Sequence, residues 1–172
     1  KLGGVELNYS SDIDLVFLYE EEGQTDHVRP TTNREYFDRL ARDLVKLVGE
    51  STEHGSCYRI DMRLRPEGSR GPLVQPVDAM IAYYDTRGRT WERQAMIKAR
   101  PVAGDLGLGQ RLLDVLEPWV YRRYLTMADI AGIKSLKRRI ESRSTGEGDD
   151  ACDVKTGHGG IRDIEFVIQF LQ

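Results

Sequence analysis

A run of apolar and β-branched residues from Ser11 to Tyr19 begins with two carboxylates, Asp12 and Asp14. Its composition predicts a strand. Residues two apart in a strand point to the same face, so both carboxylates are expected to share one face. The apolar residues that follow cover both faces, which is typical of a strand buried within a sheet. Two like charges at the start of such a strand repel each other, and water, a basic side chain or a divalent cation would offset that repulsion.

The composition limits the classes of function that this chain can have. The chain has 172 residues, enough for one substantial core or for a core with a helical appendage. Its net charge of −3 argues against a general nucleic-acid coat or an anionic membrane partner. No apolar run approaches the roughly 20 residues that a membrane span needs. Cys57 and Cys152 lack a CxxC partner, which favours a reduced, cytoplasmic setting.

Hydrophobic periodicity predicts a small α/β region at residues 1–75. After the first strand, Thr32 and Glu35 have the spacing of a capping box at the start of a helix. A second strand with one apolar and one polar face is expected over residues 57–64. A turn rich in Gly and Pro follows, and then a short strand at residues 73–74. The region is therefore expected to hold a small mixed sheet with helices.

Residues 76–172 show helical patterns and predict a separate helical region. Pro118 is expected to kink or break one of these helices, and Thr126 to cap the next. The helices are expected at 77–87, 90–100, 106–125, 128–143 and from residue 160, with a polar, Gly-rich loop at 142–150. Because the chain starts without methionine and ends inside an amphipathic pattern, we expect a fragment of a longer protein.

Three features strengthen the interpretation of Asp12 and Asp14 as a metal site. Gly3 and Gly4 lie upstream, where backbone amides can approach phosphate oxygens closely because no Cβ intervenes. Ser10 and Ser11 add hydroxyl groups between these glycines and the carboxylates. Asp61, on the polar face of the second strand, completes a possible triad of carboxylates. Two alternatives stay open: a solvated turn for the Asp12-x-Asp14 pair, and an ion pair of Asp61 with Arg59 or Arg63.

Three carboxylates around divalent cations, next to a Gly-Gly turn, are typical of a site for nucleotidyl transfer. Arg63 and Arg65 would contact phosphate oxygens, because a guanidinium fork matches their geometry. The alternative for Arg65 is that it holds a turn carbonyl. Lys155 and the Gly-rich run 157–160 could form a phosphate-contacting loop before a helix, and the alternative for Gly159-Gly160 is a tight turn.

The Gly-Gly turn, the Asp-x-Asp strand and the later single Asp resemble the polymerase-β-like nucleotidyltransferases. Longer strings are similar to the adenylyl-transfer domains of the glutamine synthetase adenylyltransferase family. These strings span nearly the whole chain in the family's order: residues 1–14, 59–66, 91–100, 153–155 and 159–166. The resemblance implies a polymerase-β-like nucleotidyltransferase core at 1–75, followed by the helical region.

The resemblance also implies a bifunctional cytoplasmic enzyme. One domain of such an enzyme attaches AMP from ATP to a tyrosine of glutamine synthetase, and the other removes AMP by phosphorolysis and releases ADP. PII regulatory protein and glutamine set the balance between them. The strings Gly71-Pro72-Leu73-Val74 and Met96-Ile97-Lys98-Ala99-Arg100 resemble the N-terminal, deadenylylating half, whereas Asp163 stands where that half often has Glu. Adenylylation and a non-catalytic docking role for the helical half are the alternatives.

By resemblance, the site residues fall into two groups. Asp12, Asp14 and Asp61 would be catalytic and would bind Mg²⁺ or Mn²⁺. The groups that would face the nucleotide and phosphates are Gly3, Gly4, Ser11, Arg63, Arg65, Lys98, Arg100 and Lys155. An ordinary helix surface explains Lys98 and Arg100 equally well. Tyr83, Tyr84 and Trp91 are interpreted as core or interface residues rather than as base-stacking ones.

Overall fold

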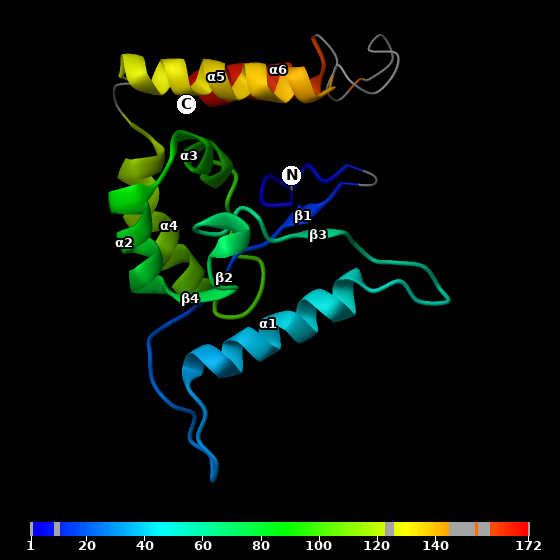
Figure 1. The fold of residues 1–172 in the computed structure, drawn as a ribbon, viewed down its shortest axis with the longest axis vertical. Helices are drawn as coiled ribbons and strands as arrows, with labels where there is room; N and C mark the ends of the chain where they lie inside the picture. Colours follow the sequence, from blue (N-terminus) through cyan, green and yellow to red (C-terminus); the bar gives the residue numbers. More distant parts are fainter. Residues whose placement is uncertain (1, 9–10, 123–125, 145–153, 155–158, 172) are drawn as a thin grey trace. The chain divides into compact units, whose positions relative to one another are not determined.

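A computed structural model describes residues 2–8, 11–122, 126–144, 154 and 159–171 (Figure 1). The chain forms two compact units. The first consists of Lys1–Gly88 and Lys98–Trp119, and the second of Arg89–Ile97 and Val120–Gln172. Both helices and strands are present, so the molecule is a mixed α/β protein, as the sequence predicts. The named strands of the described residues form two parallel two-stranded sheets, and not the single small mixed sheet that was expected.

The expected first strand is two short strands that belong to different sheets. β1 (Ile13–Asp14) pairs in parallel with β3 (Ile60–Asp61), and β2 (Phe17–Tyr19) pairs in parallel with β4 (Val74–Pro76). The prediction of one continuous strand over 11–19 is therefore wrong. The reason is that its partners come from two segments of the chain that a turn separates.

The second predicted strand, over residues 57–64, is shortened to β3 by local hydrogen bonds. The backbone N–H of Arg63 donates to the Asp61 carboxylate at 2.8 Å, and not to a neighbouring strand. The Arg65 guanidinium then donates to the Met62 carbonyl at 2.6 Å. Side chains that bond to nearby backbone compete with the strand ladder in this way. The chain therefore turns after only two paired residues, although the alternation of polar and apolar residues continues to Leu64.

Helix α1 (Asn33–Gly49) lies along the strands of the first unit (Figure 1). The predicted capping box at its start is confirmed: the Glu35 N–H donates to the Thr32 hydroxyl at 3.1 Å, and the Thr32 N–H to Glu35 at 3.0 Å. Phe37 stacks on Tyr19, with ring centroids 5.4 Å apart. The buried cluster on this side consists of Tyr19, Ala41 and Val74, with Phe17, Phe37 and Leu73 packed against it.

Helices α2 (Val77–Arg87) and α4 (Leu106–Val120) belong to the first unit, apart from Val120 at the end of α4. The bounds of α2 match the prediction. Tyr84 packs against Trp119, with ring centroids 5.1 Å apart. Pro118 lies in the last turn of α4, which ends five residues before the expected residue 125. Helix α2 packs against β4, and both helices fall in the first unit, so the two compact units do not divide at residue 75.

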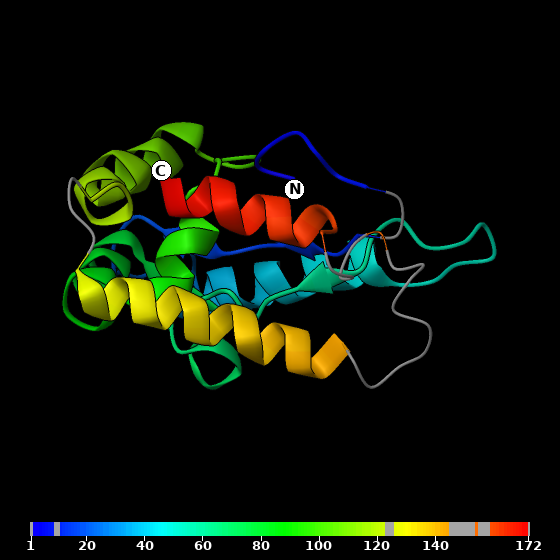
Figure 2. The same cartoon turned by 90° about the horizontal axis from the view of Figure 1, so that it is seen from above.

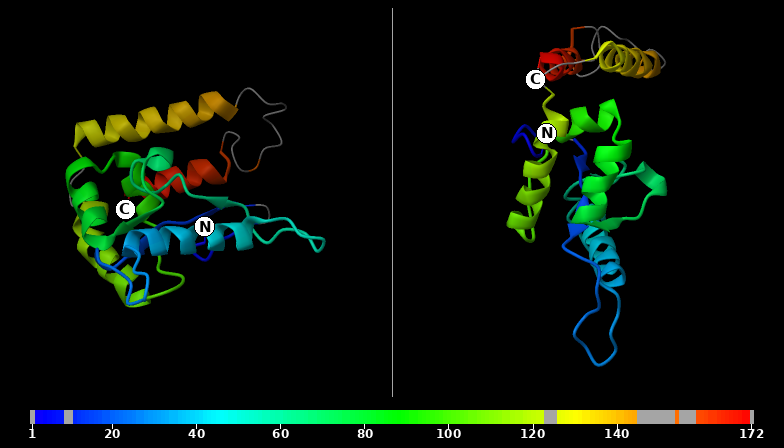
Figure 3. Two further views of the ribbon diagram at one scale, coloured as in Figure 1. Left: turned by 60° about the horizontal axis from the view of Figure 1, so that its bottom comes forward. Right: turned by 90° about the vertical axis from the view of Figure 1, so that its left-hand side faces the viewer.

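The second unit consists of α3 (Thr90–Met96), α5 (Met127–Ser144) and α6 (Ile161–Leu171). Helix α3 packs against α5 and ends four residues before the expected Arg100. Helix α6 runs back beside α5 in the opposite direction (Figures 2 and 3). The expected polar loop at 142–150 begins inside α5, and its residues 145–150 lie outside the described residues. No helix in the described part of the chain is long and apolar enough to cross a membrane.

Gly88 is expected to be a position where even one methyl group disrupts packing. A Cβ at Gly88 would lie 2.4 Å from the Trp119 ring and 2.5 Å from the Tyr84 carbonyl oxygen. Gly88→Ala should therefore lower the free energy of unfolding by about 1–3 kcal/mol. At Gly132, inside α5, a new Cβ would lie 3.5 Å from the Thr90 hydroxyl, which is an ordinary van der Waals distance.

The matched substitution Gly132→Ala should instead raise the free energy of unfolding by about 0.5–1 kcal/mol, because alanine favours a helix interior. Urea unfolding of both variants measures the two effects. Equal effects of the same sign would contradict the assignment of Gly88 to a close contact.

Candidate active site

The parallel register of β1 and β3 brings together two of the predicted catalytic carboxylates. Asp14 is the register partner of Asp61, and Ile13 is the partner of Ile60. The Ile13 N–H donates to the Arg59 carbonyl at 2.8 Å, and the Leu15 N–H to the Asp61 carbonyl at 3.1 Å. Side chains of register partners project to the same face, so Asp14 and Asp61 lie side by side. Asp14 is exposed and Ile13 on the opposite face is buried.

Asp12 lies one residue before β1, where the register continues toward Arg59. The Arg59 Nε donates to the Asp12 carboxylate at 2.6 Å. Both side chains are substantially exposed, so this ion pair adds little to stability. Asp12 thus pairs with a basic side chain. A basic side chain was one of the three ways in which its repulsion with Asp14 was expected to be offset.

Arg63 pairs with the third carboxylate, Asp61. Its Nε lies 3.0 Å and 2.9 Å from the two carboxylate oxygens of Asp61. These hydrogen bonds hold the pKa of Asp61 below its usual range. Asp61 raises the pKa of Arg63 most strongly, and the charges of Asp12 and Asp14 act in the same direction. Arg63 therefore contacts Asp61 directly, whereas Asp12 and Asp14 act on it through their charges. The alternative in which Asp61 pairs with Arg63 is what the structure shows.

The oxygen ligands of the three carboxylates fit a hard divalent cation, but arginines pair with two of them. Among the described residues, no group of three acidic, histidine or cysteine side chains is arranged to hold a metal ion as it stands. Mg²⁺ commonly binds one or two carboxylates together with substrate phosphates, and does not require an all-protein cage. The positive guanidinium of Arg63 shows that this face accommodates a cation. Metal binding by Asp12, Asp14 and Asp61 stays a prediction.

Arg65 holds the turn that follows β3. Its guanidinium donates to the Met62 carbonyl at 2.6 Å and to the Gly71 carbonyl at 3.2 Å. A Cβ at Gly71 would lie 2.1 Å from the Pro66 carbonyl oxygen, so only glycine fits this close approach. The alternative in which Arg65 holds turn carbonyls is thus confirmed by geometry.

Lys98 and Arg100 lie after α3, against the N-terminal turn that contains Gly3 and Gly4. The Lys98 Nζ lies 2.9 Å from the Glu6 carboxylate, and Arg100 donates to the Leu2 carbonyl at 3.4 Å. A Cβ at Gly3 would lie 1.8 Å from the Lys98 carbonyl oxygen. The missing side chain of Gly3 therefore allows this turn to pack on the backbone at Lys98. The helix-surface alternative for both cations is wrong, because α3 ends at Met96.

The other residues that were predicted to contact phosphate are Ser11, Lys155 and the Gly-rich run before α6. The Ser11 N–H donates to the Asn8 carbonyl at 3.2 Å, which closes a turn just before Asp12. Lys155 and Ser10 lie outside the described residues. The Gly159 N–H donates to the Asp163 carboxylate at 2.9 Å at the start of α6. That bond supports the tight-turn alternative for Gly159-Gly160. The assignment of Tyr83 and Tyr84 to the core is confirmed, since both are buried.

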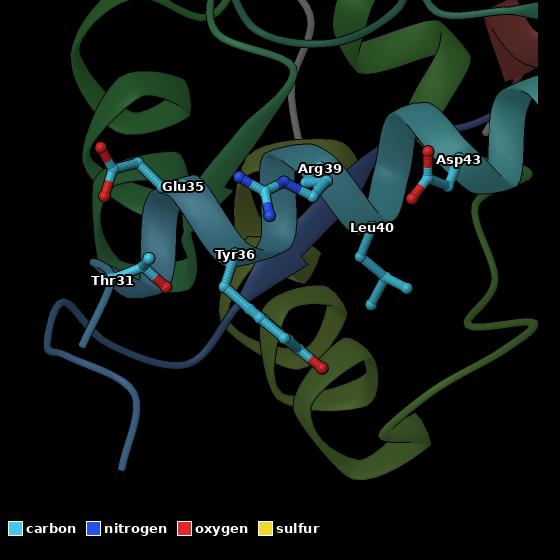
Figure 4. Close-up of a pocket in the computed structure, with 6 residues that line it drawn as sticks. All are labelled: Thr31, Glu35, Tyr36, Arg39, Leu40 and Asp43. Carbon is cyan, nitrogen blue, oxygen red and sulfur yellow. The ribbon is translucent and has the colours of Figure 1, made fainter. Parts of the chain in front are cut away.

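A surface hollow on α1 lies apart from these residues in the first unit (Figure 4). It is lined by residues of the helix and of the segment before it: Thr31, Glu35, Tyr36, Arg39, Leu40 and Asp43. Its lining residues are not those of the carboxylate group.

Comparison with known proteins identifies the family. Residues 1–115 match the family described as "Glutamate-ammonia ligase adenylyltransferase". The chain belongs to the glutamate-ammonia ligase adenylyltransferase family. Residues 112–172 also match a family described as "GlnD PII-uridylyltransferase". The family resemblance drawn from the sequence is therefore confirmed.

Three relatives in this adenylyltransferase family carry the name "Bifunctional glutamine synthetase adenylyltransferase/adenylyl-removing enzyme". They come from Thioalkalivibrio sulfidiphilus, Nitrosococcus oceani and Pseudomonas aeruginosa, and are 48%, 51% and 48% identical to this chain. Each match covers 100% of this chain and 18% of the relative. The chain thus spans about a fifth of the length of these relatives.

Two features of this family member were missed by sequence reasoning. Glu6 pairs with Lys98 across 92 residues of sequence, and no local pattern indicates such a contact. A buried polar group in the second unit contains Glu92, Arg93 and Asp129. The spacing of Thr126 and Asp129, which follows the capping-box pattern with Asp in place of Glu, was a usable signal for the last of these.

Proposed function

We propose that this chain is a nucleotidyltransferase domain that removes AMP from an adenylylated tyrosine of glutamine synthetase by phosphorolysis. The observation that carries the proposal is the register of Asp14 opposite Asp61, with Asp12 two residues before Asp14 and the Arg63 guanidinium on Asp61. Two adjacent parallel strands that present carboxylates on one face are also compatible with a polymerase-β-like core. The names of the relatives supply the substrate protein.

In the proposed site, Asp12, Asp14 and Asp61 would hold Mg²⁺ or Mn²⁺. A divalent cation bound there would neutralise negative charge on the in-line transition state and activate the attacking oxygen. The protein's part is to position the three carboxylates on paired strands, and to supply Arg63 as a cationic contact for phosphate oxygens. Lys98 and Arg100 support the N-terminal turn next to which the phosphates would bind.

The reaction exchanges one phosphorus–oxygen bond for another. An oxygen of inorganic phosphate attacks the phosphorus of the AMP group. The bond from that phosphorus to the tyrosine oxygen breaks, and the phenolate leaves and takes up a proton. The new phosphorus–oxygen–phosphorus linkage makes ADP. Adenylylation with ATP uses the same carboxylates with tyrosine as the attacking group.

The direction of AMP transfer is proposed from two strings. Gly71-Pro72-Leu73-Val74 and Met96-Ile97-Lys98-Ala99-Arg100 resemble the deadenylylating half of the family. In the structure the first string closes the turn that Arg65 holds, and the second packs on the turn at Gly3. Each string thus contacts a residue that the proposal assigns to the phosphates, Arg65 for the first and Gly3 for the second. Adenylylation of glutamine synthetase with ATP is the alternative function.

The test is to incubate the chain with adenylylated glutamine synthetase, phosphate and Mg²⁺ and to measure ADP. A full-length relative with both activities serves as the positive control. ADP formation supports phosphorolysis. AMP-modified synthetase formed from ATP, with no ADP released from the modified protein, supports the alternative. Binding of synthetase with neither reaction would favour the docking role. Control by PII protein and a cytoplasmic location are proposed for the longer protein.

Exchange of the charges at Glu6 and Lys98 tests how Lys98 acts. Glu6→Lys or Lys98→Glu alone places like charges together, and each should lower turnover roughly fivefold by loosening the N-terminal turn. The double variant restores an ion pair of reversed sense and should recover turnover to within about twofold of the wild type. Steady-state kinetics of all four proteins measures the coupling. A double variant as slow as Lys98→Glu would show instead that Lys98 contacts phosphate directly.

A further inference from the structure

Arg63 and Asp61 form an ion pair in which the two side chains are exposed to solvent to very different extents. The side chain of Asp61 is 15% exposed, whereas that of Arg63 is 78% exposed. The guanidinium nevertheless reaches both carboxylate oxygens, and the Arg63 backbone N–H donates to the same carboxylate at 2.8 Å. The side chain can therefore leave Asp61 without exposing buried apolar surface, and the backbone hydrogen bond keeps the carboxylate in place when it does.

The carboxylate oxygens that Arg63 occupies are the ones that a metal would need. A divalent cation bound to Asp61 and the Arg63 guanidinium cannot share the same oxygen lone pairs on that face. The field of Asp12 and Asp14 also acts on Arg63, so the three carboxylates retain the guanidinium while no other cation is present. Arg59 shields Asp12 in the same manner, at 2.6 Å.

We propose that Arg63 is a tethered counter-cation, which occupies the Asp61 carboxylate until a divalent cation replaces it and which then turns to the phosphate of the nucleotide. This inference rests on the proposed metal site at Asp12, Asp14 and Asp61. It gives Arg63 two opposite effects. Arg63 competes with the metal when nucleotide is absent, and it strengthens nucleotide binding once the metal is bound.

Mn²⁺ binding without nucleotide tests the competition. Titration of the chain in 0.15 M salt, followed by the paramagnetic resonance signal of free Mn²⁺, gives the dissociation constant. Arg63→Gln should bind Mn²⁺ roughly fivefold more tightly than the wild type, since the ion pair no longer has to be broken. Arg63→Lys keeps the charge and loses the fork, and should show a smaller increase in affinity.

Arg70→Gln is the matched control, because it removes the same charge from another position of the segment that joins β3 to β4. Its Mn²⁺ affinity should equal that of the wild type, whereas an equal gain in Arg70→Gln and Arg63→Gln would show a general charge effect and overturn the proposal. The second measurement is the affinity for ADP in saturating Mn²⁺, which should fall in Arg63→Gln. An unchanged or raised ADP affinity in that variant would also overturn it.

These titrations separate a failure of the counter-cation proposal from a failure of the proposed metal site. If Mn²⁺ binds the wild type, Asp61→Asn abolishes that binding and Arg63→Gln changes nothing, the tethered counter-cation is refuted and the metal site stands. If neither the wild type nor any folded Arg63 variant binds Mn²⁺, the proposed metal site and this inference both fall. Circular dichroism establishes that each variant is folded before its titration is interpreted.

Discussion

Replacement of Asp12 and Asp14 together by asparagine is expected to abolish nucleotide turnover while the fold survives. A metal contributes several kcal/mol of transition-state stabilisation, so its loss should slow the reaction by about a thousandfold or more. Asp14 is exposed, and Asp12 makes an ion pair that is substantially exposed to solvent. Neither side chain holds the core. The measurement is ADP release from adenylylated glutamine synthetase, alongside thermal unfolding.

The matched control for this double variant is Asp26→Asn with Asp85→Asn. It removes two charges at exposed positions, one in the segment between β2 and α1 and the other on α2. Its turnover should stay near that of the wild type, since screening weakens the field of distant surface charges. Wild-type turnover in the Asp12 and Asp14 variant would refute the proposed metal site. A large drop in its unfolding temperature would show instead that the two carboxylates serve the fold.

The helices were more predictable from sequence than the strands, for a physical reason. A helix is made of local hydrogen bonds, so the capping box of Thr32 and Glu35 already marks its start. A strand needs a partner that is distant in sequence. The division of residues 11–19 between β3 and β4 depends on the turn that Arg65 closes, and no periodicity within that run encodes it.

The candidate site was predictable in its members but not in their pairing. The alternation of residues along each strand placed Asp12 and Asp14 on one face and Asp61 on the polar face of another strand. Which arginine binds which carboxylate depends on side-chain geometry, and the sequence offered Arg59 and Arg63 equally. The structure gives Arg59 to Asp12 and Arg63 to Asp61. The long-range pair of Glu6 and Lys98 has no local signal at all.

Replacement of Asp129 by alanine is expected to be the most destabilising of the substitutions considered. Its carboxylate lies 3.2 Å from Arg93, and these side chains are 11% and 9% exposed. It also lies 3.5 Å from Arg122 and accepts hydrogen bonds from the N–H and hydroxyl of Thr126, at 3.1 Å and 2.7 Å. Without it, two arginines would face each other in a poorly solvated site. Removal of one partner from a buried pair costs about 3–5 kcal/mol.

Asp105→Ala is the matched control for the loss of a helix cap alone. Asp105 accepts a hydrogen bond from the Leu108 N–H at 3.1 Å in an exposed setting. Its removal should cost about 1 kcal/mol. The excess cost of Asp129→Ala over Asp105→Ala, measured by urea unfolding, isolates the buried ion pair. Equal costs in the two variants would show that Asp129 acts only as a cap.

The pH dependence of stability provides a second test of the role of Asp129. The hydrogen bond from Thr126 is the main cause that holds the pKa of Asp129 below its usual range, with Arg93 acting in the same direction. A depressed folded-state pKa means that the unfolded chain binds the proton more tightly. The stabilisation is therefore complete above the unfolded-state pKa of about 4 and is lost as the pH falls through the lower, folded-state value. Asp129→Asn, which does not titrate, should show a shallower loss of stability below about pH 4 than the wild type does. Parallel acid-unfolding curves for the two proteins would mean that Asp129 has the same pKa in the folded and unfolded chain, and that its contact with Arg93 does not favour the charged form.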